Sequence, residues 1–472
     1  MSIHPLLVSL VTASSLAAGV TVVVAQSDSV GGHGGFKFEP LPASAVCVPG
    51  GVGVAPNEQP FLLPQGFVQT VIAREGDGGA PDNFDMNTLN ETGRQAGRFL
   101  YRSHETLENG AISVTDLRTG MTRVLVQRAD WNRMDGMVWT PWRTILTAEE
   151  MRPERLPSLP DPTVPQALAG LLYEVDPQSG TTVARPALGA KAHEGIRFDR
   201  AGNVYGISET APTTRVGTPP QARPGGYIFK FTPDRRGDLS SGQLFALKIV
   251  NDFGDRTGEA IWLPLDRQAV QVDADAAATA AGATGYARPE DVETATSTGN
   301  DRNPGENLYV AVTDEHRVLR IELGPRRHDD DDDDDGEGDD DAARGHRNRQ
   351  TAFVSDYVRQ GVNAPADFTN PDNLALDKGG NLFITEDTVT PPGTDIWMAT
   401  PASRHTWMAA TTVRFASLTD CFGEPSGIYF DFTGKVLFAH VLHRGAAPAG
   451  QPALPDTRDL AVMITQDRRQ RD

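Results

Sequence analysis

The segment Asp199-Arg200-Ala201-Gly202-Asn203-Val204-Tyr205 returns later in the chain as Asp377-Lys378-Gly379-Gly380-Asn381-Leu382-Phe383. A third, looser copy is Asp431-Phe432-Thr433-Gly434-Lys435-Val436-Leu437-Phe438. In each copy an apolar segment precedes an Asp-x-x-Gly turn and a second apolar segment follows, which is typical of a β-hairpin. Repeated hairpins of this type build propeller blades. The repeat therefore predicts an all-β fold, a single large β-propeller with loop insertions, and a β-sandwich is the competing architecture.

The composition of the 472-residue chain agrees with many short strands. It contains 47 Gly and 34 Pro, scattered along the sequence, and this favours frequent turns over long helices. Apolar runs of strand length recur, for example at residues 67–72, 171–175 and 308–312. The formal net charge of −20 argues against nucleic acid as a partner, because a phosphate backbone attracts basic proteins.

The first residues have the pattern of an export signal. An apolar stretch over residues 6–24 ends in Val23-Val24-Ala25, which offers small residues for cleavage before Gln26. We therefore expect a signal peptide over residues 1–25 and a secreted or periplasmic protein, with an uncleaved anchor as the alternative. No later segment has the length of apolar sequence that a membrane span requires, so we expect no integral membrane segment after cleavage.

The rest of the chain divides by composition. We expect an N-terminal extension over residues 26–60, the propeller over 61–445 and a C-terminal tail over 446–472. An Ala/Thr/Gly-rich segment, 276–303, has the composition of an insertion within the propeller. Residues 326–349 include the run from Asp329 to Asp335, and a charge block of this kind predicts a disordered acidic loop. The sequence does not indicate an oligomeric state.

The chain has two cysteines, Cys47 and Cys421. In an oxidising compartment a disulfide between them would close a loop of most of the protein, for which the entropic gain is greatest in theory. Two free buried thiols are the alternative. Metal binding by two isolated cysteines is disfavoured.

The hairpin repeat also predicts where polar side chains gather. The innermost strand of each blade runs along the central channel, so residues that flank it converge on the axis. Carboxylates, amides and imidazoles flank the three repeat copies: His193, Glu194, Glu209, Asp372, Asn373, Glu386, Asp387, Glu424, His440 and His443. Oxygen-rich clusters with few imidazoles suit hard cations such as Ca²⁺, Mg²⁺ or Mn²⁺.

Taken in order, several motifs resemble a known family. They are Asp85-Met86-Asn87-Thr88-Leu89-Asn90-Glu91-Thr92-Gly93, Gly97-Arg98-Phe99-Leu100-Tyr101-Arg102-Ser103-His104-Glu105, Trp139-Thr140-Pro141-Trp142 with Glu149-Glu150, Ala192-His193-Glu194-Gly195, Val204-Tyr205-Gly206-Ile207-Ser208-Glu209, Arg288-Pro289-Glu290-Asp291 and Pro371-Asp372-Asn373. This succession, across residues 60–445, is similar to the PhoX-type alkaline phosphatases.

The resemblance implies a calcium cluster, with ferric iron in the characterised phosphatases, on the propeller axis. The metal ligands it implies here are Asp135, Glu149, Glu194, Glu209, Glu290, Glu386 and Asp372, with Glu105 and Asp291 as further candidates. The catalytic residues it implies are Arg288, Glu149 and Glu209, with Arg288 holding a phosphate oxygen, since a guanidinium presents a planar fork to such anions.

The sequence departs from the family pattern at three positions. The phosphatases have an iron-ligating Cys where this chain has Met134-Asp135-Gly136, so the resemblance implies a divergent member that lacks this ligand. Ala148 stands where relatives often have Cys, and Arg143 where they commonly have Gly. Ca²⁺ is the cofactor we expect, whereas Fe³⁺ loses its sulfur ligand.

These features predict a secreted metal-dependent hydrolase that acts on a small-molecule phosphomonoester. Two alternatives stay open on the same scaffold: a calcium-dependent lactonase or esterase, and a non-enzymatic, calcium-stabilised binding propeller.

Overall fold

The structure is a computed structural model that describes residues 30, 35–48, 59–153, 160–216, 221–294, 307–324, 350–387, 394–401, 408–444 and 458–467. The expected signal peptide (1–25) and acidic loop (326–349) lie outside the described residues. Within the described residues, no helix has the length and apolar character needed to cross a membrane.

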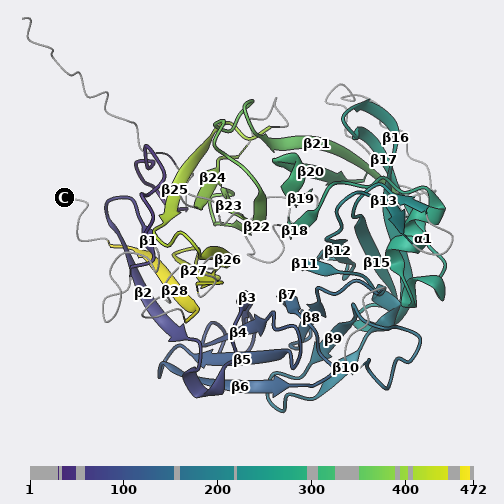
Figure 1. Ribbon diagram of the computed structural model, residues 1–472, viewed down its shortest axis with the longest axis horizontal. Coiled ribbons are helices and arrows are strands. Elements are labelled where there is room, and N and C mark those ends of the chain that lie inside the picture. Colours follow the sequence, from purple (N-terminus) through teal and green to yellow (C-terminus); the bar gives the residue numbers. More distant parts are fainter. Residues whose placement is uncertain are drawn as a thin grey trace, which may run out of the picture.

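The described residues form six antiparallel blades arranged as a ring (Figure 1). Blade 1 contains β3 (Phe84–Leu89), β4 (Phe99–His104), β5 (Ala111–Asp116) and β6 (Met121–Gln127). Blade 2 contains β7 (Met134–Trp139), β8 (Ile145–Glu149), β9 (Leu172–Val175) and β10 (Thr182–Ala184). Blade 3 contains β11 (His193–Phe198), β12 (Val204–Ser208), β15 (Ile228–Arg235) and β16 (Asp238–Gly254).

The second half of the ring repeats this order. Blade 4 contains β18 (Pro289–Thr294), β19 (Asn307–Val312), β20 (Arg317–Leu323) and β21 (Thr351–Arg359). Blade 5 contains β22 (Pro371–Leu376), β23 (Leu382–Glu386), β24 (Asp395–Ala399) and β25 (Thr412–Leu418), with β1 (Phe61–Leu62) at its edge. Blade 6 contains β26 (Glu424–Phe430), β27 (Val436–Leu442), β28 (Leu460–Gln466) and β2 (Phe67–Arg74).

A few elements lie outside this pattern. Strand β17 (Thr257–Pro264) pairs with both β16 and β21, which joins blades 3 and 4 into one sheet. Strands β13 (Thr213–Val216) and β14 (Gln221–Arg223) form a separate hairpin. The described helical segments are α1 (Ala274–Ala281), η1 (Asp77–Gly79), η2 (Pro186–Leu188), η3 (Ala269–Gln271) and η4 (Thr313–Glu315).

The six inner strands close on one another around the axis. Each of β3, β7, β11, β18 and β22 packs against the inner strand of the next blade, and β26 packs against β3. Apolar cores fill the spaces between blades; one of them contains Met86 and Ile112 of blade 1 together with Met137 and Tyr173 of blade 2. The prediction of an all-β propeller is confirmed.

The repeated motif forms the turn between the first two strands of blades 3, 5 and 6. Asp199 Oδ1 accepts the N–H of Asn203, and Asp377 Oδ1 accepts that of Asn381 at the equivalent turn. Gly202 and Gly380 have φ of +87° and +77°, a region that glycine enters without steric cost. The Asp-x-x-Gly pattern therefore specifies the hairpin through one carboxylate and one left-handed residue.

Strands from the early and late parts of the described chain meet in blade 6. Strand β28 pairs with β27 on one side and with β2 on the other, both antiparallel. Residues 460–466 therefore complete a blade, and the expected C-terminal tail over 446–472 needs this correction. The pattern hid the strand because β28 is separated in sequence from the hairpin that precedes it, and no repeat of the turn motif marks it.

The segment 276–303 is also more than an insertion. Residues 289–294 form β18, the inner strand of blade 4, and Ala278 of α1 is buried in the core between blades 2 and 3. The Ala/Thr/Gly-rich composition concealed these elements because a small-residue helix and a short strand give little apolar periodicity.

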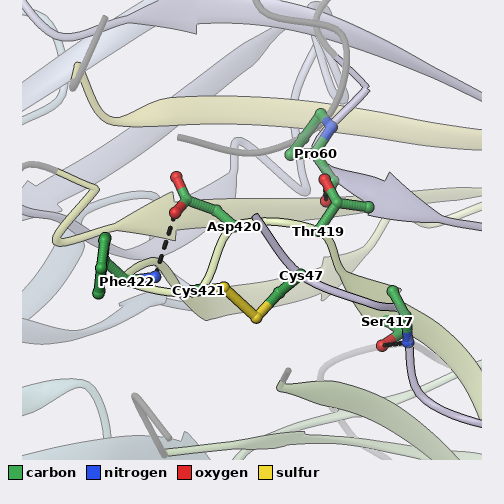
Figure 2. Close-up of a disulfide and its surroundings, with 8 residues drawn as sticks. Cys47, Pro60, Ser417, Thr419, Asp420, Cys421 and Phe422 are labelled. Atoms are coloured by element: carbon green, nitrogen blue, oxygen red, sulfur yellow. Dashed lines mark hydrogen bonds between the residues drawn. A yellow bond between two sulfur atoms is a disulfide. The ribbon is translucent and has the colours of Figure 1, made fainter. Parts of the chain in front are cut away.

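The N-terminal segment is fastened to blades 5 and 6. Phe36 packs among the rings of Phe67, Phe383 and Phe430, and Cys47 is disulfide-bonded to Cys421 across a separation of 374 residues. Figure 2 shows this bond beside Thr419, whose carbonyl accepts the N–H of Val48. Of the two alternatives for the cysteines, the structure shows the disulfide.

Removing β28 should prevent the ring from closing. A chain that ends at Asp459 loses the buried side chains of Leu460, Val462 and Ile464, each worth about 1.5–3 kcal/mol, against a typical total stability of about 5–15 kcal/mol. We expect no cooperative thermal transition by circular dichroism, whereas a control chain that ends at Asp467 should melt like the full chain. A folded protein ending at Asp459 would contradict the role given to β28.

Breaking the disulfide should destabilise the folded state without abolishing it. For Cys47→Ser combined with Cys421→Ser, we expect the free energy of unfolding in urea to fall by about 2–5 kcal/mol, since the unfolded chain regains the entropy of a long open loop. A reductant should lower the stability of the unmodified protein by a similar amount and leave the double variant unchanged. An equal response of both proteins to reductant would show that the bond contributes nothing.

Candidate metal and catalytic site on the propeller axis

A bulge near the start of every inner strand organises the site. The register shifts after Phe84 in β3, Met134 in β7, His193 in β11, Pro289 in β18, Pro371 in β22 and Ser426 in β26. A bulge inserts an unpaired residue and re-aims its side chain. The residue that follows the shift is a carboxylate in five blades: Asp85, Asp135, Glu194, Glu290 and Asp372. In blade 6 this position is Gly427.

These five carboxylates line one pocket of about 210 Å³. Their backbones approach closely there: a Cβ on Gly136 would lie 2.0 Å from the carbonyl oxygen of Glu194, and one on Gly195 would lie 2.5 Å from the backbone nitrogen of Val292. Glycine next to the bulge carboxylate therefore lets neighbouring inner strands converge. The carboxylates are brought together by the same contact that closes the ring.

A second set of carboxylates comes from the strand beside each inner strand. Each stands directly after the residue that pairs with the start of the bulge: Glu105, Glu150, Glu209 and Asp387. In blade 4 this position is Thr313, whose hydroxyl donates to the carbonyl oxygen of Pro371. Glu424 and His443 of blade 6 also line the pocket. Ten carboxylates therefore surround it within the part of the chain that the structure describes.

Glu149 and Glu386 face away from this pocket. Glu149 accepts the backbone N–H groups of Asn132 and Leu171, and Glu386 accepts those of Thr369 and Asp395. Successive residues of a strand point to opposite sides, so the next residue in each case, Glu150 or Asp387, lines the pocket instead. We therefore replace Glu149 and Glu386 in the ligand set by their C-terminal neighbours.

The other predicted residues divide in the same way. Asp135, Glu194, Glu209, Glu290, Asp372, Glu105 and Arg288 line the pocket as expected. Asp291 lies in the wall instead, where it accepts the N–H groups of Val292 and Leu374. His440 is buried and accepts from the Nε of Arg102. The prediction missed Arg133 and Asp85 as site residues. Arg133 precedes an inner strand as Arg288 does, and Asp85 is the second residue of an inner strand as Glu290 is. Comparing the inner strands in the sequence could therefore have identified both.

Two arginines provide the pocket's guanidinium groups. Arg288 and Arg133 each precede an inner strand and have φ of +53° and +46°. Arg288 Nε lies 2.7 Å from Glu209 Oε1, and its Nη2 lies 2.7 Å from Glu290 Oε1. Arg133 Nη1 lies 2.5 Å from Glu105 Oε1. Each arginine therefore has a left-handed backbone conformation just before its inner strand, and its guanidinium points into the carboxylate cluster.

The pocket contains more negative charge than its two guanidinium groups can balance. Burial, followed by the charge of Glu105, raises the pKa of Asp85 to about 7. Burial, followed by the charge of Asp135, raises the pKa of Glu194 well above its usual value, and burial with Glu209 does the same to the pKa of Glu290. Such crowding disfavours the fully ionised cluster unless positive charge is bound there.

The donor set fits a hard cation. Oxygen atoms of Glu150, Glu194 and Glu209 lie within 4.8 Å of one another, a spacing that can hold a metal ion. The buried Oδ1 of Asp135 has no hydrogen-bond partner among the described residues. All these donors are carboxylate oxygens, which Ca²⁺ and Mg²⁺ prefer, and both cysteines of the chain are engaged in the disulfide.

Comparison with known proteins agrees with this geometry. The model of the family described as alkaline phosphatase PhoX matches residues 135–445, more than half of the chain. The chain belongs to the PhoX alkaline phosphatase family. Its place in the PhoX family makes it a phosphatase-like hydrolase with a small-molecule substrate.

One solved structure extends the likeness in fold beyond the residues of the family match. PhoX of Pseudomonas fluorescens, in a complex with vanadate as a transition state analogue, aligns with a TM-score of 0.59 at 16% identity, covering 91% of this chain and 98% of that one. A luciferin-regenerating enzyme aligns with a TM-score of 0.44 at 10% identity, covering 85% of this chain and 95% of that one. A comparison with curated proteins found no match. The PhoX alignment supports a shared fold that includes blade 1, which the family match leaves out.

Paired substitutions should separate the residue that faces the pocket from its neighbour. Glu150→Gln removes a charge from the candidate triad, so we expect calcium affinity, measured calorimetrically on chelator-treated protein, to fall about tenfold or more. Glu149→Gln weakens buried hydrogen bonds instead, so we expect it to lower the melting temperature and keep calcium affinity within about twofold. The reverse pattern would restore Glu149 as the ligand.

Proposed function

We propose that this chain is an exported phosphomonoester hydrolase that works at a cluster of hard cations, chiefly Ca²⁺, held on the propeller axis. The observation that carries the proposal is the ring of carboxylates at one structural position in five blades, joined by Arg288 in the same pocket. Membership of the PhoX family supports the reaction class. The apolar stretch over residues 6–24 and the disulfide support export into an oxidising compartment.

Glu150, Glu194 and Glu209 would hold the first cation, because their oxygen atoms already lie together. Asp135, Glu290 and the other pocket carboxylates offer oxygen ligands for further cations. Bound cations would supply Lewis acidity and would neutralise the charge of a phosphate ester.

Arg288 is the residue we assign to substrate binding. Its guanidinium bridges carboxylates of blades 3, 4 and 5, namely Glu209, Glu290 and Asp387, and its side chain is 27% exposed, so an anion in the pocket can reach it. Cations that draw those carboxylates away would leave the planar fork free to donate two hydrogen bonds to phosphate oxygens. Arg133, between Glu105 and Glu150, is placed to act in the same way from blade 2.

His443 and Glu424 are candidates for handling the proton of the leaving alcohol. His443 Nε2 lies 3.9 Å from Glu424 Oε2 at the pocket rim, and the imidazole is 36% exposed. Histidine and glutamate are among the side chains that enzymes use to transfer protons to or from a reacting group. Both side chains belong to blade 6, where the bulge residue is Gly427 and Glu424 supplies the carboxylate that lines the pocket.

The iron of the characterised phosphatases is a separate matter from calcium. The resemblance places an iron-ligating Cys in the segment that here contains Asp135, and Asp135 lines the pocket with one oxygen unpartnered among the described residues. We therefore propose an all-oxygen cluster in which Asp135 is a hard ligand. Elemental analysis of the purified protein for calcium and iron decides between the two compositions.

The proposal predicts hydrolysis of p-nitrophenyl phosphate that stops when a calcium chelator is added and returns with calcium. Arg288→Lys keeps the positive charge and removes the planar fork, so we expect kcat/KM to fall about 10- to 100-fold. The control Arg235→Lys, at an exposed turn of blade 3, should leave kcat/KM unchanged. A protein that binds calcium tightly and turns over no phosphate ester would sink the phosphatase proposal and leave the metal site standing.

A further inference from the structure

A second, larger pocket lies at the opposite end of the propeller, between blades 1 and 2. Its volume is about 970 Å³, and its wall includes Asn90 after β3, Phe99 at the start of β4 and Trp139 at the end of β7. The axial site lies at the other ends of these strands, where Asp85 begins β3. Five residues of extended strand separate Asp85 from Asn90, a distance of about 17 Å. The two pockets are therefore distinct.

Three aromatic side chains contribute to the wall of this distal pocket. Phe99, Tyr101 and Trp139 line it, and the rings of Tyr101 and Trp139 stack with centroids 6.0 Å apart and an interplanar angle of 23°. The Trp139 indole N–H donates to Thr92 Oγ1 at 3.0 Å, which fixes the orientation of the ring. A wall of this kind, in a pocket at the upper end of the usual size range, suits a planar apolar body.

The distal pocket is positively charged in a chain whose net charge is −20. Arg94, Arg123 and Arg143 line it, and none of them forms an ion pair with a carboxylate in the part of the chain that the structure describes. The carboxylate in the described wall, Asp116, is already bound by both Nε and Nη2 of Arg98 at 2.9 and 2.6 Å. Three guanidinium groups therefore remain available to an anion.

The backbone conformation of Arg143 is a separate observation that points to a function for the distal pocket. It occupies a β-turn position with φ of +76°, where glycine is favoured and a side chain costs about 1–3 kcal/mol. The exposed Arg143 side chain has no hydrogen bond among the described contacts that would offset this strain. A strained residue that presents a guanidinium to a pocket suggests function rather than stability.

We propose that the distal pocket binds a small aromatic anion, a planar ring that carries a sulfonate, carboxylate or phosphate group. The ring lies against Tyr101 and Trp139, and the acidic group accepts hydrogen bonds from the arginines, whose forked donors match such oxygens. The inference does not depend on the reaction at the axial site.

A ligand series tests both parts of this chemistry on the mature protein. Naphthalene-1-sulfonate is the probe, 1-naphthol supplies the ring without the charge, and methanesulfonate supplies the charge without the ring. By calorimetry we expect the probe to bind at least about tenfold more tightly than either comparator. Failure of the probe to bind, or equal affinity for one of the comparators, would overturn the proposal.

Two sets of variants locate the binding. In the combined Arg94→Gln, Arg123→Gln and Arg143→Gln variant, we expect affinity for the probe to fall about tenfold, the sum of three exposed charge interactions. The control removes the same charge from exposed arginines at the turns of blade 3 through Arg200→Gln, Arg235→Gln and Arg236→Gln, and should bind as the unmodified protein does. Equal weakening in both would show non-specific charge attraction and would refute the site.

The single variant Arg143→Gly tests whether weaker probe binding could result from a loss of folded structure. Glycine relieves the left-handed backbone strain, so we expect the melting temperature to stay the same or rise while affinity for the probe falls about two- to threefold. Unchanged affinity in this variant would remove Arg143 from the site.

Discussion

The structure depends on the antiparallel pairing of β2 with β28, which joins a strand near the start of the described chain to the last strand. A sheet edge left unpaired would expose a row of backbone donors and acceptors, and here both ends of the chain supply strands to the same blade. Once the ring is closed, the six inner strands must face one another across a narrow axis. The Cys47–Cys421 bond and the packing of Phe36 against Phe67 fasten the N-terminal segment over this same region. The pairing of β2 with β28 therefore both closes the ring and sets the geometry of the axial site.

Closing the ring brings buried carboxylates together, and their repulsion and desolvation destabilise the ionised pocket. A bulge at the same place in each inner strand aims Asp85, Asp135, Glu194 and their counterparts into about 210 Å³, where burial and mutual repulsion raise their pKa values. Two guanidinium groups offset only part of this charge. A fold selected for stability alone would place apolar side chains at these positions, since buried unpaired charge is destabilising. Their presence is intelligible if the folded state includes bound cations, whose affinity adds to stability by mass action.

The sequence predicted the hairpins and the region of the site better than the individual ligands. The Asp-x-x-Gly turns were recognisable because Asp199 and Asp377 make a local contact that needs no knowledge of the fold. The choice between Glu149 and Glu150 was not local: it depends on the pairing register of β7 with β8, because a shift of one residue exchanges the two faces of a strand. Strand β28 was missed for a similar reason, since one of its two partners, β2, lies at the other end of the sequence. The order of the motifs predicted which segments lie at the pocket, but only the strand register shows which of their side chains line it.

The residue at position 135, where the resemblance implies a cysteine in the phosphatases, is explained by the ring. Asp135 occupies the bulge position of β7, and four other inner strands carry a carboxylate at that position. With aspartate there, blade 2 follows the rule of blades 1, 3, 4 and 5, whereas a cysteine would make blade 2 the exception. A thiolate favours softer metals and a carboxylate favours hard ones, and with aspartate here all five of these bulge positions carry oxygen donors. Because the backbone beside it is held by the close approach of Gly136 to the Glu194 carbonyl, the side chain at 135 can change while its direction stays fixed. The bulged propeller thus separates the geometry of the pocket, set by the backbone, from the chemistry of its lining, set by the residue at each bulge.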